Sequence, residues 1–515
     1  MAFEEYLLPV GLPLLLVAAA SLLRKPKATL PPGPKPKLLI GNLFDVPTQL
    51  AWLTYTKWRK QYGDLVFFGV FGNNFLILNS LKATTDLLDK RATIYSERPS
   101  IPSIRLMGWE FSFSFMSHTD KWRGGKFVPF DMSSSTDETI NIIAQKIVSS
   151  ALSPRRSSLM LHNLLTTPED FLEHVEQLTT AIIMAMVYGY DIKSLHDDPI
   201  VHLQQESIKR LSESAIPGRF MVNVFPFLRH VPAWFPGAGF HQFFKDTVKL
   251  VGQMKQAPFD FVKQNMQSGS DRQSVLRELL EHNEAHGGSV EREEDMKDIA
   301  GVAYAAAAET TTATLMVSVM ALAMHPEVVR KAQAELDAVV GLGSLPGFEH
   351  RSELPYCEAV VREIFRWRPI TPVAIAHATH EDDVYDGYLI PKGTIILPNV
   401  WAMVHDETMY PDPDTFKPER FLNADGTLNS DDLIIGFGFG RRICAGRHAA
   451  DATLWAATVS LLATFNIGKA KDAAGKEIEI EDVFTDGMVS YPKPFKCSIT
   501  PRNELTKQLV SNINL

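Results

Sequence analysis

Residues 437–446 read Phe-Gly-Phe-Gly-Arg-Arg-Ile-Cys-Ala-Gly, and this stretch constrains the fold more than any other part of the chain. Gly438 and Gly440 allow the backbone to take positive φ angles or to pass close to a bulky planar group. Cys444 stands at the end of this bend, directly before a helical pattern over 447–462. Amide groups of the bend and of the helix start can point toward the sulfur and stabilise its thiolate. The stretch therefore predicts a cysteine held on a bent loop at the start of a helix.

The residues around this cysteine favour a metal-bound thiolate over an inert buried side chain. Arg442 precedes Cys444 by two residues, where its guanidinium can reach an anionic group of the same cofactor. A lone cysteine is usually a small buried hydrophobe, and we adopt that interpretation for Cys357 and Cys497. For Cys444 the neighbouring glycines and arginine argue against it.

Composition and patterning predict one large domain that is mainly α with a small β portion. The chain has 515 residues, 45% of them hydrophobic, and a formal net charge of −9. The chain lacks the basic excess that would indicate a nucleic-acid partner. Its three separated cysteines argue against a disulfide framework. No long linker or repeat interrupts 39–502, and a tail follows over 503–515. The predicted elements are a hairpin over 65–78, strands at 384–388 and 394–398, helices at 171–188, 247–265, 295–324, 327–340 and 356–366, and a polar surface connection over 269–295.

The N-terminus predicts a membrane anchor over residues 1–29. The segment 6–23 carries no charge, acidic residues precede it, and Arg24, Lys25 and Lys27 follow it. This length is near the lower limit for a transmembrane helix, and the flanking charges keep the rest of the chain cytosolic. A cleaved signal peptide is the alternative. The proline-rich stretch 30–38 then predicts a stiff hinge.

The decapeptide resembles the heme-binding signature of the cytochrome P450 superfamily, in which a cysteine thiolate is the axial iron ligand. The resemblance implies the cytochrome P450 fold, heme b as cofactor, Cys444 as its metal ligand, and Phe437 and Arg442 as heme contacts. Two further elements match in order: Glu363-Ile364-Phe365-Arg366 and Pro418-Glu419-Arg420-Phe421. In the family, their glutamate and two arginines form a buried, structural cluster beneath the heme loop.

Upstream, Ala306-Ala307-Ala308-Glu309-Thr310-Thr311 resembles the oxygen-activation motif of the family's long central helix. The Thr310 hydroxyl can bond to the carbonyl of residue 306 and open the helix locally, and Glu309 can relay protons. Position 307 is alanine where the family often has glycine. A polar stripe on an alanine-rich core helix is the alternative when the motif is taken alone.

Two more heme contacts follow from the resemblance, and one segment departs from it. Trp122 and His377 occupy positions that the family uses against the heme propionates. After Arg123 the pattern breaks over 124–145, a Ser/Thr/Asp-rich stretch that we interpret as an insertion or a retained intron, with a lineage-specific loop as the alternative. The second propionate contact stays unassigned between Lys126 and Lys146.

The resemblance implies a membrane-anchored heme-thiolate monooxygenase of the endoplasmic reticulum, spanning once with its catalytic domain in the cytosol. It would use O2 and electrons from a separate NADPH–cytochrome P450 reductase, because the chain contains no flavin- or nicotinamide-binding segment. Residues 106–111 resemble fungal microsomal members that oxidise terpenoids, polyketides or alkaloids. Apolar segments predict a hydrophobic small-molecule substrate: 99–116, 216–225, 303–307 and 371–375. The alternatives are a heme-thiolate isomerase or dehydratase, against which Glu309 and Thr310 argue, and an inactive heme-binding paralogue disabled by 124–145.

Overall fold

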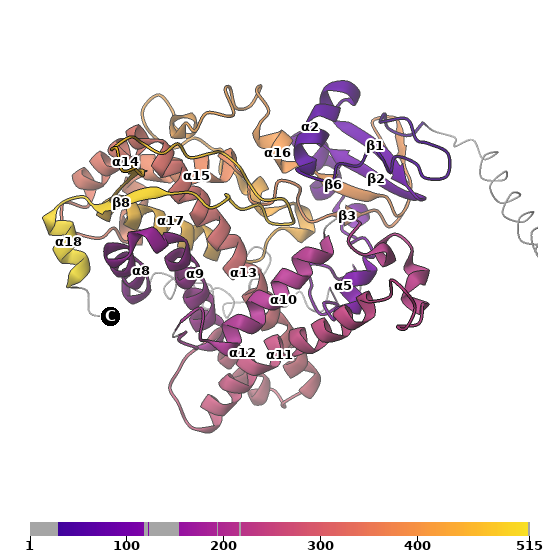
Figure 1. Ribbon diagram of the computed structural model, residues 1–515, viewed down its shortest axis with the longest axis horizontal. Helices are drawn as coiled ribbons and strands as arrows, with labels where there is room; N and C mark the ends of the chain where they lie inside the picture. The colour runs from indigo at the N-terminus through magenta and orange to yellow at the C-terminus, as the bar shows by residue number, and fades with distance from the viewer. Residues whose placement is uncertain (1–28, 118–121, 123–153, 193, 216–217, 513–515) are drawn as a thin grey trace, which may run out of the picture.

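The computed structural model describes residues 29–117, 122, 154–192, 194–215 and 218–512. The predicted transmembrane segment 6–23, the departing segment 124–145, and both Lys126 and Lys146 lie outside the described residues. Within them, helices dominate and the β portion is small, as predicted from the sequence; the sheet with β1, β2 and β6 lies at one end of the molecule and β8 near the other, beside α18 (Figure 1).

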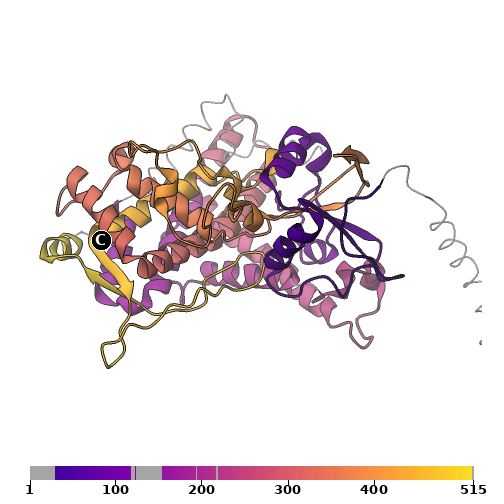
Figure 2. The same cartoon turned by 90° about the horizontal axis from the view of Figure 1, so that it is seen from above.

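The helices surround α13, the longest of the described elements, which packs against α9, α11, α12 and α17. Figure 2 shows the same structure turned by 90° about the horizontal axis, with the indigo N-terminal segments, which include α2 and the β1–β2 hairpin, at the right. The α-helices are α2 Ala51–Tyr62, α3 Leu81–Thr84, α4 Ala92–Tyr95, α5 Pro102–Leu106, α8 Pro154–Thr166, α9 Phe171–Tyr188, α10 Pro199–Ala215, α11 Phe240–Gln267, α12 Val275–Ala285, α13 Val290–Met324, α14 Pro326–Val339, α15 Pro355–Trp367, α16 Val400–Val404, α17 Arg447–Thr464 and α18 Glu504–Ser511. Shorter turns are the π-helix η1 Thr85–Lys90 and the 3-10 helices η2 Pro168–Asp170, η3 Met221–Asn223, η4 Pro226–His230, η5 Phe348–Glu353, η6 Pro418–Phe421, η7 Ile434–Phe437 and η8 Gly440–Arg442.

The β portion forms three small sheets. The strands are β1 Leu65–Val70, β2 Asn73–Leu78, β3 His377–Ala378, β4 Asp383–Tyr385, β5 Tyr388–Ile390, β6 Ile395–Pro398, β7 Phe465–Lys469 and β8 Cys497–Pro501. The largest sheet has the order β1-β2-β6-β3, with β4–β5 and β7–β8 as separate pairs. The predicted hairpin is confirmed: β1 and β2 pair antiparallel, with Leu65 opposite Leu78, and Gly72 at φ 82° allows the tight turn. The predicted strand at 384–388 instead contains a turn, because Asp386 and Gly387 both have positive φ.

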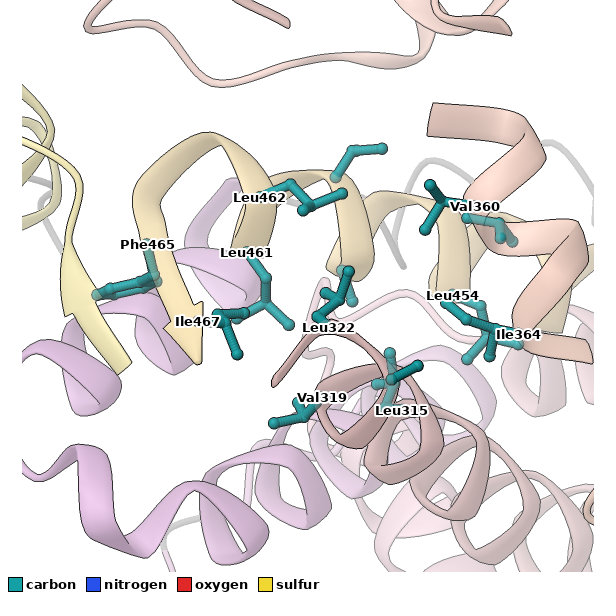
Figure 3. Close-up of a cluster of buried hydrophobic side chains, with 14 of the residues drawn as sticks. Leu315, Val319, Leu322, Val360, Ile364, Leu454, Leu461, Leu462, Phe465 and Ile467 are labelled. Atoms are coloured by element: carbon teal, nitrogen blue, oxygen red, sulfur yellow. The ribbon is translucent and has the colours of Figure 1, made fainter. Parts of the chain in front are cut away.

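The main hydrophobic core lies around the C-terminal half of α13. Its last turns, 315–324, are apolar except for Ser318 and are almost entirely buried, as expected for a helix that other elements enclose. Ten of the side chains in this cluster are labelled in Figure 3: Leu315, Val319, Leu322, Val360, Ile364, Leu454, Leu461, Leu462, Phe465 and Ile467. Among the described residues, α13 is the one helix long and apolar enough to cross a membrane, and 72% of its most apolar window is buried. Its hydropathy is therefore that of a core helix.

The segment 269–295 is not the surface connection that its polarity predicted. It contains α12, whose N-terminus is capped by the Ser274 side chain. Val275, Leu276 and Leu280 are buried on one face, next to α13. Three apolar positions are enough to bury one face of this helix, although most of its residues are polar.

Candidate functional site

The loop before α17 has the bend that its glycines predicted. The Cys444 amide donates to the Phe437 carbonyl at 2.8 Å and closes the bend. Gly438 and Gly440 have φ angles of 89° and 55°. A Cβ added to Gly440 would lie 2.0 Å from the Leu88 carbonyl oxygen. Gly440 is therefore required for a close approach to the π-helix η1 as well as for its positive φ.

The Cys444 side chain is exposed in the structure. Desolvation by the surrounding protein nevertheless raises the pKa of its thiol. The Gly446 amide and the charge of Arg447 act in the opposite direction and lower the pKa. Cys357, in contrast, is buried among core side chains, and Cys497 lies in β8. A desolvated thiol with an amide directed at its sulfur is suited to a metal cation, which would deprotonate it.

Arg442 joins this loop to the segment after α5. Its guanidinium donates to the carbonyls of Ser96, Phe113 and Met116 at 2.8–2.9 Å. It also lies 4.2 Å over the buried Trp122 ring, in a cation–π contact. The two predicted heme contacts Arg442 and Trp122 are therefore brought together.

A second buried arginine, which the sequence analysis missed, completes a cationic cluster. Arg98 donates to the carbonyls of Ile375 and Ala376 at 2.8 and 2.6 Å, and its Nε has no partner among the described residues. The predicted contact His377 is buried beside it and bonds through Nδ1 to the Tyr95 carbonyl. The only sequence signal for Arg98 is its place before Pro99 and an apolar stretch.

The electrostatics of this cluster call for an anion. Burial, followed by the charge of Arg442, lowers the pKa of Arg98 to about 9. Burial also lowers the pKa of Arg442 to about 10. For His377, burial and the charges of Arg98 and Arg442 lower the pKa to about 3. Glu97 counteracts both arginine shifts but leaves the pKa values low. Two arginines that still carry charge at neutral pH, with one Nε unpartnered, fit the carboxylates of a heme.

The oxygen-activation motif lies in the middle of α13. The Thr310 hydroxyl donates to the Ala306 carbonyl at 3.0 Å, as predicted. The predicted local opening is wrong, because α13 continues as an unbroken α-helix through Thr310. Ala306 is exposed although it stands mid-helix, and Ala308 belongs to the apolar cluster against which Ala445 packs. The residue after Cys444 and the oxygen-activation motif therefore border the same region.

Glu309 has the proton affinity that a proton relay needs. Desolvation raises its pKa to about 6, with a further increase from Glu176 and a decrease from the Tyr491 hydroxyl. A carboxyl group with this pKa both gives up and regains a proton near neutral pH.

The predicted Glu–Arg–Arg cluster is present beneath the loop. Glu363 and Arg366 are both 0% exposed and form a two-point ion pair at 2.7 and 2.8 Å. Arg420 reaches the same carboxylate at 3.1 Å. Phe365, on the same helix, lies 5.2 Å from the Phe437 ring and connects the cluster to the cysteine loop. Phe365 of α15 thus supports the loop through the Phe437 ring.

An exposed thiol on this loop, a buried cationic cluster and a Thr–Glu pair on a central helix are the features expected of a heme-thiolate protein. The family model for cytochrome P450 matches residues 31–499. The chain is 39% identical to cytochrome P450 monooxygenase COX2 of Coprinopsis cinerea over 490 residues, which cover 93% of this chain and 90% of that protein. It is 38% identical to cytochrome P450 monooxygenase ple1 of Rhodocybe pseudopiperita, covering 95% and 92%, and 36% identical to claR of Ampulloclitocybe clavipes, covering 94% and 88%.

The chain belongs to the cytochrome P450 family. It is a monooxygenase whose cofactor is heme b with a cysteine thiolate on the iron, and it acts on a small molecule with O2 and a redox partner.

Proposed function

We propose that Cys444 is the axial ligand of heme b and that the protein oxidises a hydrophobic small molecule with electrons from NADPH–cytochrome P450 reductase. The observation that carries the proposal is the exposed, desolvated Cys444 thiol on the same loop as Arg442, whose buried cationic cluster calls for an anion. Arg98, Arg442, His377 and Trp122 would hold the heme propionates. The carboxylates would restore the charge balance that burial and mutual repulsion disturb.

When bound, the heme supplies the reductive activation of dioxygen. Around it, the Gly446 amide orients the Cys444 sulfur and stabilises negative charge on it. The Thr310 hydroxyl, anchored on the Ala306 carbonyl, accepts a proton from a neighbouring group and passes it on. Glu309 supplies that proton and regains it from the protein exterior. This proton-donating pair favours a monooxygenase over a heme-thiolate isomerase or dehydratase, which needs no protons for oxygen.

The substrate region is apolar, which supports a hydrophobic substrate such as a terpenoid, polyketide or alkaloid of secondary metabolism. Side chains from α5, α10, α11, α13 and the following loops form one cluster there, and its partly buried members include Phe111, Phe115 and Met488. On α13, the partly buried side chains of Ala303 and Ala307 add to the apolar surface on either side of Ala306 in the sequence. Small alanine side chains leave room for a bulky hydrocarbon.

We place the protein at the endoplasmic reticulum membrane, held by residues 1–29. Two exposed apolar segments of the body support this: Leu38, Leu39 and Phe44, with Phe227, Trp234 and Phe235. The second segment is joined to the β1–β2 turn by the Phe71 and Phe225 rings, 5.0 Å apart. Exposed aromatic clusters of this kind settle at the membrane interface. The proline-rich hinge is attached to the folded domain at its beginning, because the Phe67 amide of β1 donates to the Pro32 carbonyl at 2.8 Å.

The proposal is tested by the carbon monoxide difference spectrum of the reduced protein. The full chain and the Cys497→Ser control are expected to show the Soret band of a thiolate-ligated heme, and Cys444→Ser is expected to lose it. A band that persists in Cys444→Ser refutes the ligand assignment. The same spectrum with 124–145 deleted, together with sequencing of the transcript, decides whether this segment is an insertion or a retained intron. Product formation that depends on added reductase separates the enzyme from an inactive paralogue.

A further inference from the structure

Lys255 of α11 reaches across α13 at a glycine. Its ammonium donates to the Asp298 carboxylate of α13 at 2.5 Å, and both side chains are less than one fifth exposed. Its aliphatic stem lies against Gly301, where an added Cβ would stand 3.0 Å from the Lys255 Cγ and 3.4 Å from its Cδ. Gly301 therefore leaves the room that the lysine stem needs, while the charged end finds its partner on the same helix.

The same ammonium lies over an aromatic ring of the loop that follows α5. The Lys255 Nζ is 4.2 Å from the centre of the Phe111 ring, which is within the range of a cation–π contact. The ring also touches α13, because its Cε2 would be 3.6 Å from a Cβ at Gly301. One lysine thus joins three segments, α11, α13 and the loop after α5 (Figure 1).

Phe111 belongs to the apolar cluster of the proposed substrate region. Its ring stacks on the buried Trp109 ring, with centres 5.4 Å apart and planes at 20°. Met254 of α11 and Ala305 of α13 are buried in the same cluster. Ala305 directly precedes the oxygen-activation motif in the sequence. The lysine therefore fixes an aromatic side chain on one wall of this region.

Other contacts hold this loop at its ends. Arg442 donates to the carbonyls of residues 113 and 116 at 2.9 and 2.8 Å. Near the start of the loop, Arg105 and Glu110 form an ion pair at 2.6 Å, but both side chains are more than half exposed. Exposed pairs of this kind stabilise little, because water screens them. The Lys255 ammonium is partly shielded from water, so its contact with the ring is the stronger constraint on the middle of the loop.

We propose that Lys255 and Asp298 are positioning residues that hold Phe111 in place, and that Phe111 thereby sets the size of the molecules that the substrate region admits. With the ion pair intact, the ring stays against α13 and favours compact hydrophobic molecules. Without it, the ring and its loop move away from α13 and bulkier molecules enter. Asp298 acts through Lys255, whose ammonium it keeps over the ring. The inference rests on the proposed heme-thiolate site and assigns the residues that limit the size of its substrate.

The test measures how fast two nitrogen ligands reach the heme iron of the full chain, imidazole and the bulky azole clotrimazole, from the Soret shift in stopped flow. In Lys255→Met the association rate of clotrimazole relative to imidazole is expected to rise about tenfold, the size of a partly desolvated cation–π contact. Asp298→Asn should raise this ratio less, because the cation remains. Lys255→Arg keeps both the charge and the ring contact and should restore the ratio of the parent chain.

Lys263→Met is the matched control. Lys263 also links α11 to α13, through Glu293 at 3.2 Å, about two turns further along α11. It should leave the ratio unchanged. The double variant Lys255→Met/Phe111→Ala should show the same ratio as Phe111→Ala alone, because the lysine acts only through the ring. Hydrogen–deuterium exchange of residues 107–116 should be faster in Lys255→Met than in Lys263→Met.

An unchanged ratio in Lys255→Met overturns the proposal, and so does a ratio that rises equally in Lys263→Met, since the ion pair would then serve helix packing alone. Additive effects in the double variant also overturn it. The carbon monoxide spectrum of the parent chain is read separately. Absence of a thiolate Soret band there refutes the proposed function, whereas the exchange measurement needs no heme and still decides whether Lys255 holds the loop.

Discussion

The buried cluster around Glu363 gives the sharpest prediction of stability. Its carboxylate accepts from Arg366 through both oxygens, from Arg420, and from the Lys417 amide at 2.7 Å. In Glu363→Gln the shape is kept, but two arginines lose their only shared counter-charge in the cluster. Removing one partner of a buried ion pair typically costs about 3–5 kcal/mol, because the remaining charge is desolvated and uncompensated. Domains are stable by only about 5–15 kcal/mol, so this single substitution should consume a large part of the free energy of unfolding.

The measurement is denaturant unfolding of the heme-loaded chain, followed by tryptophan fluorescence and by the Soret band. The matched control is Glu349→Gln, because Glu349 is 75% exposed and lies 3.6 Å from His350; it should change the free energy of unfolding by less than about 0.5 kcal/mol. A loss below about 1 kcal/mol in Glu363→Gln would refute the reasoning, since that is the range of exposed pairs.

Three further predictions concern the loop, the cationic cluster and the membrane surface. Gly440→Ala should abolish heme loading, because the added Cβ would lie 2.0 Å from a main-chain carbonyl oxygen. The control Gly426→Ala has a similar positive φ, 83°, but open space around the added Cβ. It should cost only about 1–2 kcal/mol of stability and keep the Soret band. The pKa of His377 is about 3 in the folded protein against 6.5 in the unfolded chain, so the unfolded chain binds this proton first as the pH falls. The heme-free protein should therefore lose up to about 1.4 kcal/mol of stability per pH unit below 6.5. His377→Gln should flatten this slope in acid unfolding curves. Replacing both Trp234 and Phe235 with serine should weaken vesicle binding of the chain from which 1–28 has been removed, measured by flotation, and equal binding would exclude this surface from the membrane contact.

The parts of the site that the sequence predicted are those whose chemistry is local. The Glu363–Arg366 pair and the Thr310 hydroxyl bond join residues at most four positions apart, and the cysteine loop is closed between residues seven positions apart, so local spacing constrains them. The fold class follows for the same reason, because long apolar periodicities indicate helices before any contact is known. The failures concern context. Thr310 was expected to open α13, but packing from both sides keeps the helix intact.

Arg98 and Tyr491 show what spacing cannot supply. Arg98 is buried because carbonyls at 375 and 376, nearly three hundred residues away in the sequence, accept its N–H groups. The Tyr491 hydroxyl reaches the main-chain carbonyl of Glu309, at 3.1 Å, because its loop folds back onto α13. In both cases the side chain is ordinary in its own segment, and it gains a role only when distant backbone segments are brought beside it. In both residues the side chain donates to a main-chain carbonyl of a distant segment. The structure therefore separates two levels of the site: a local sequence pattern places the reacting groups, and long-range packing sets how tightly each of them holds its proton or its charge.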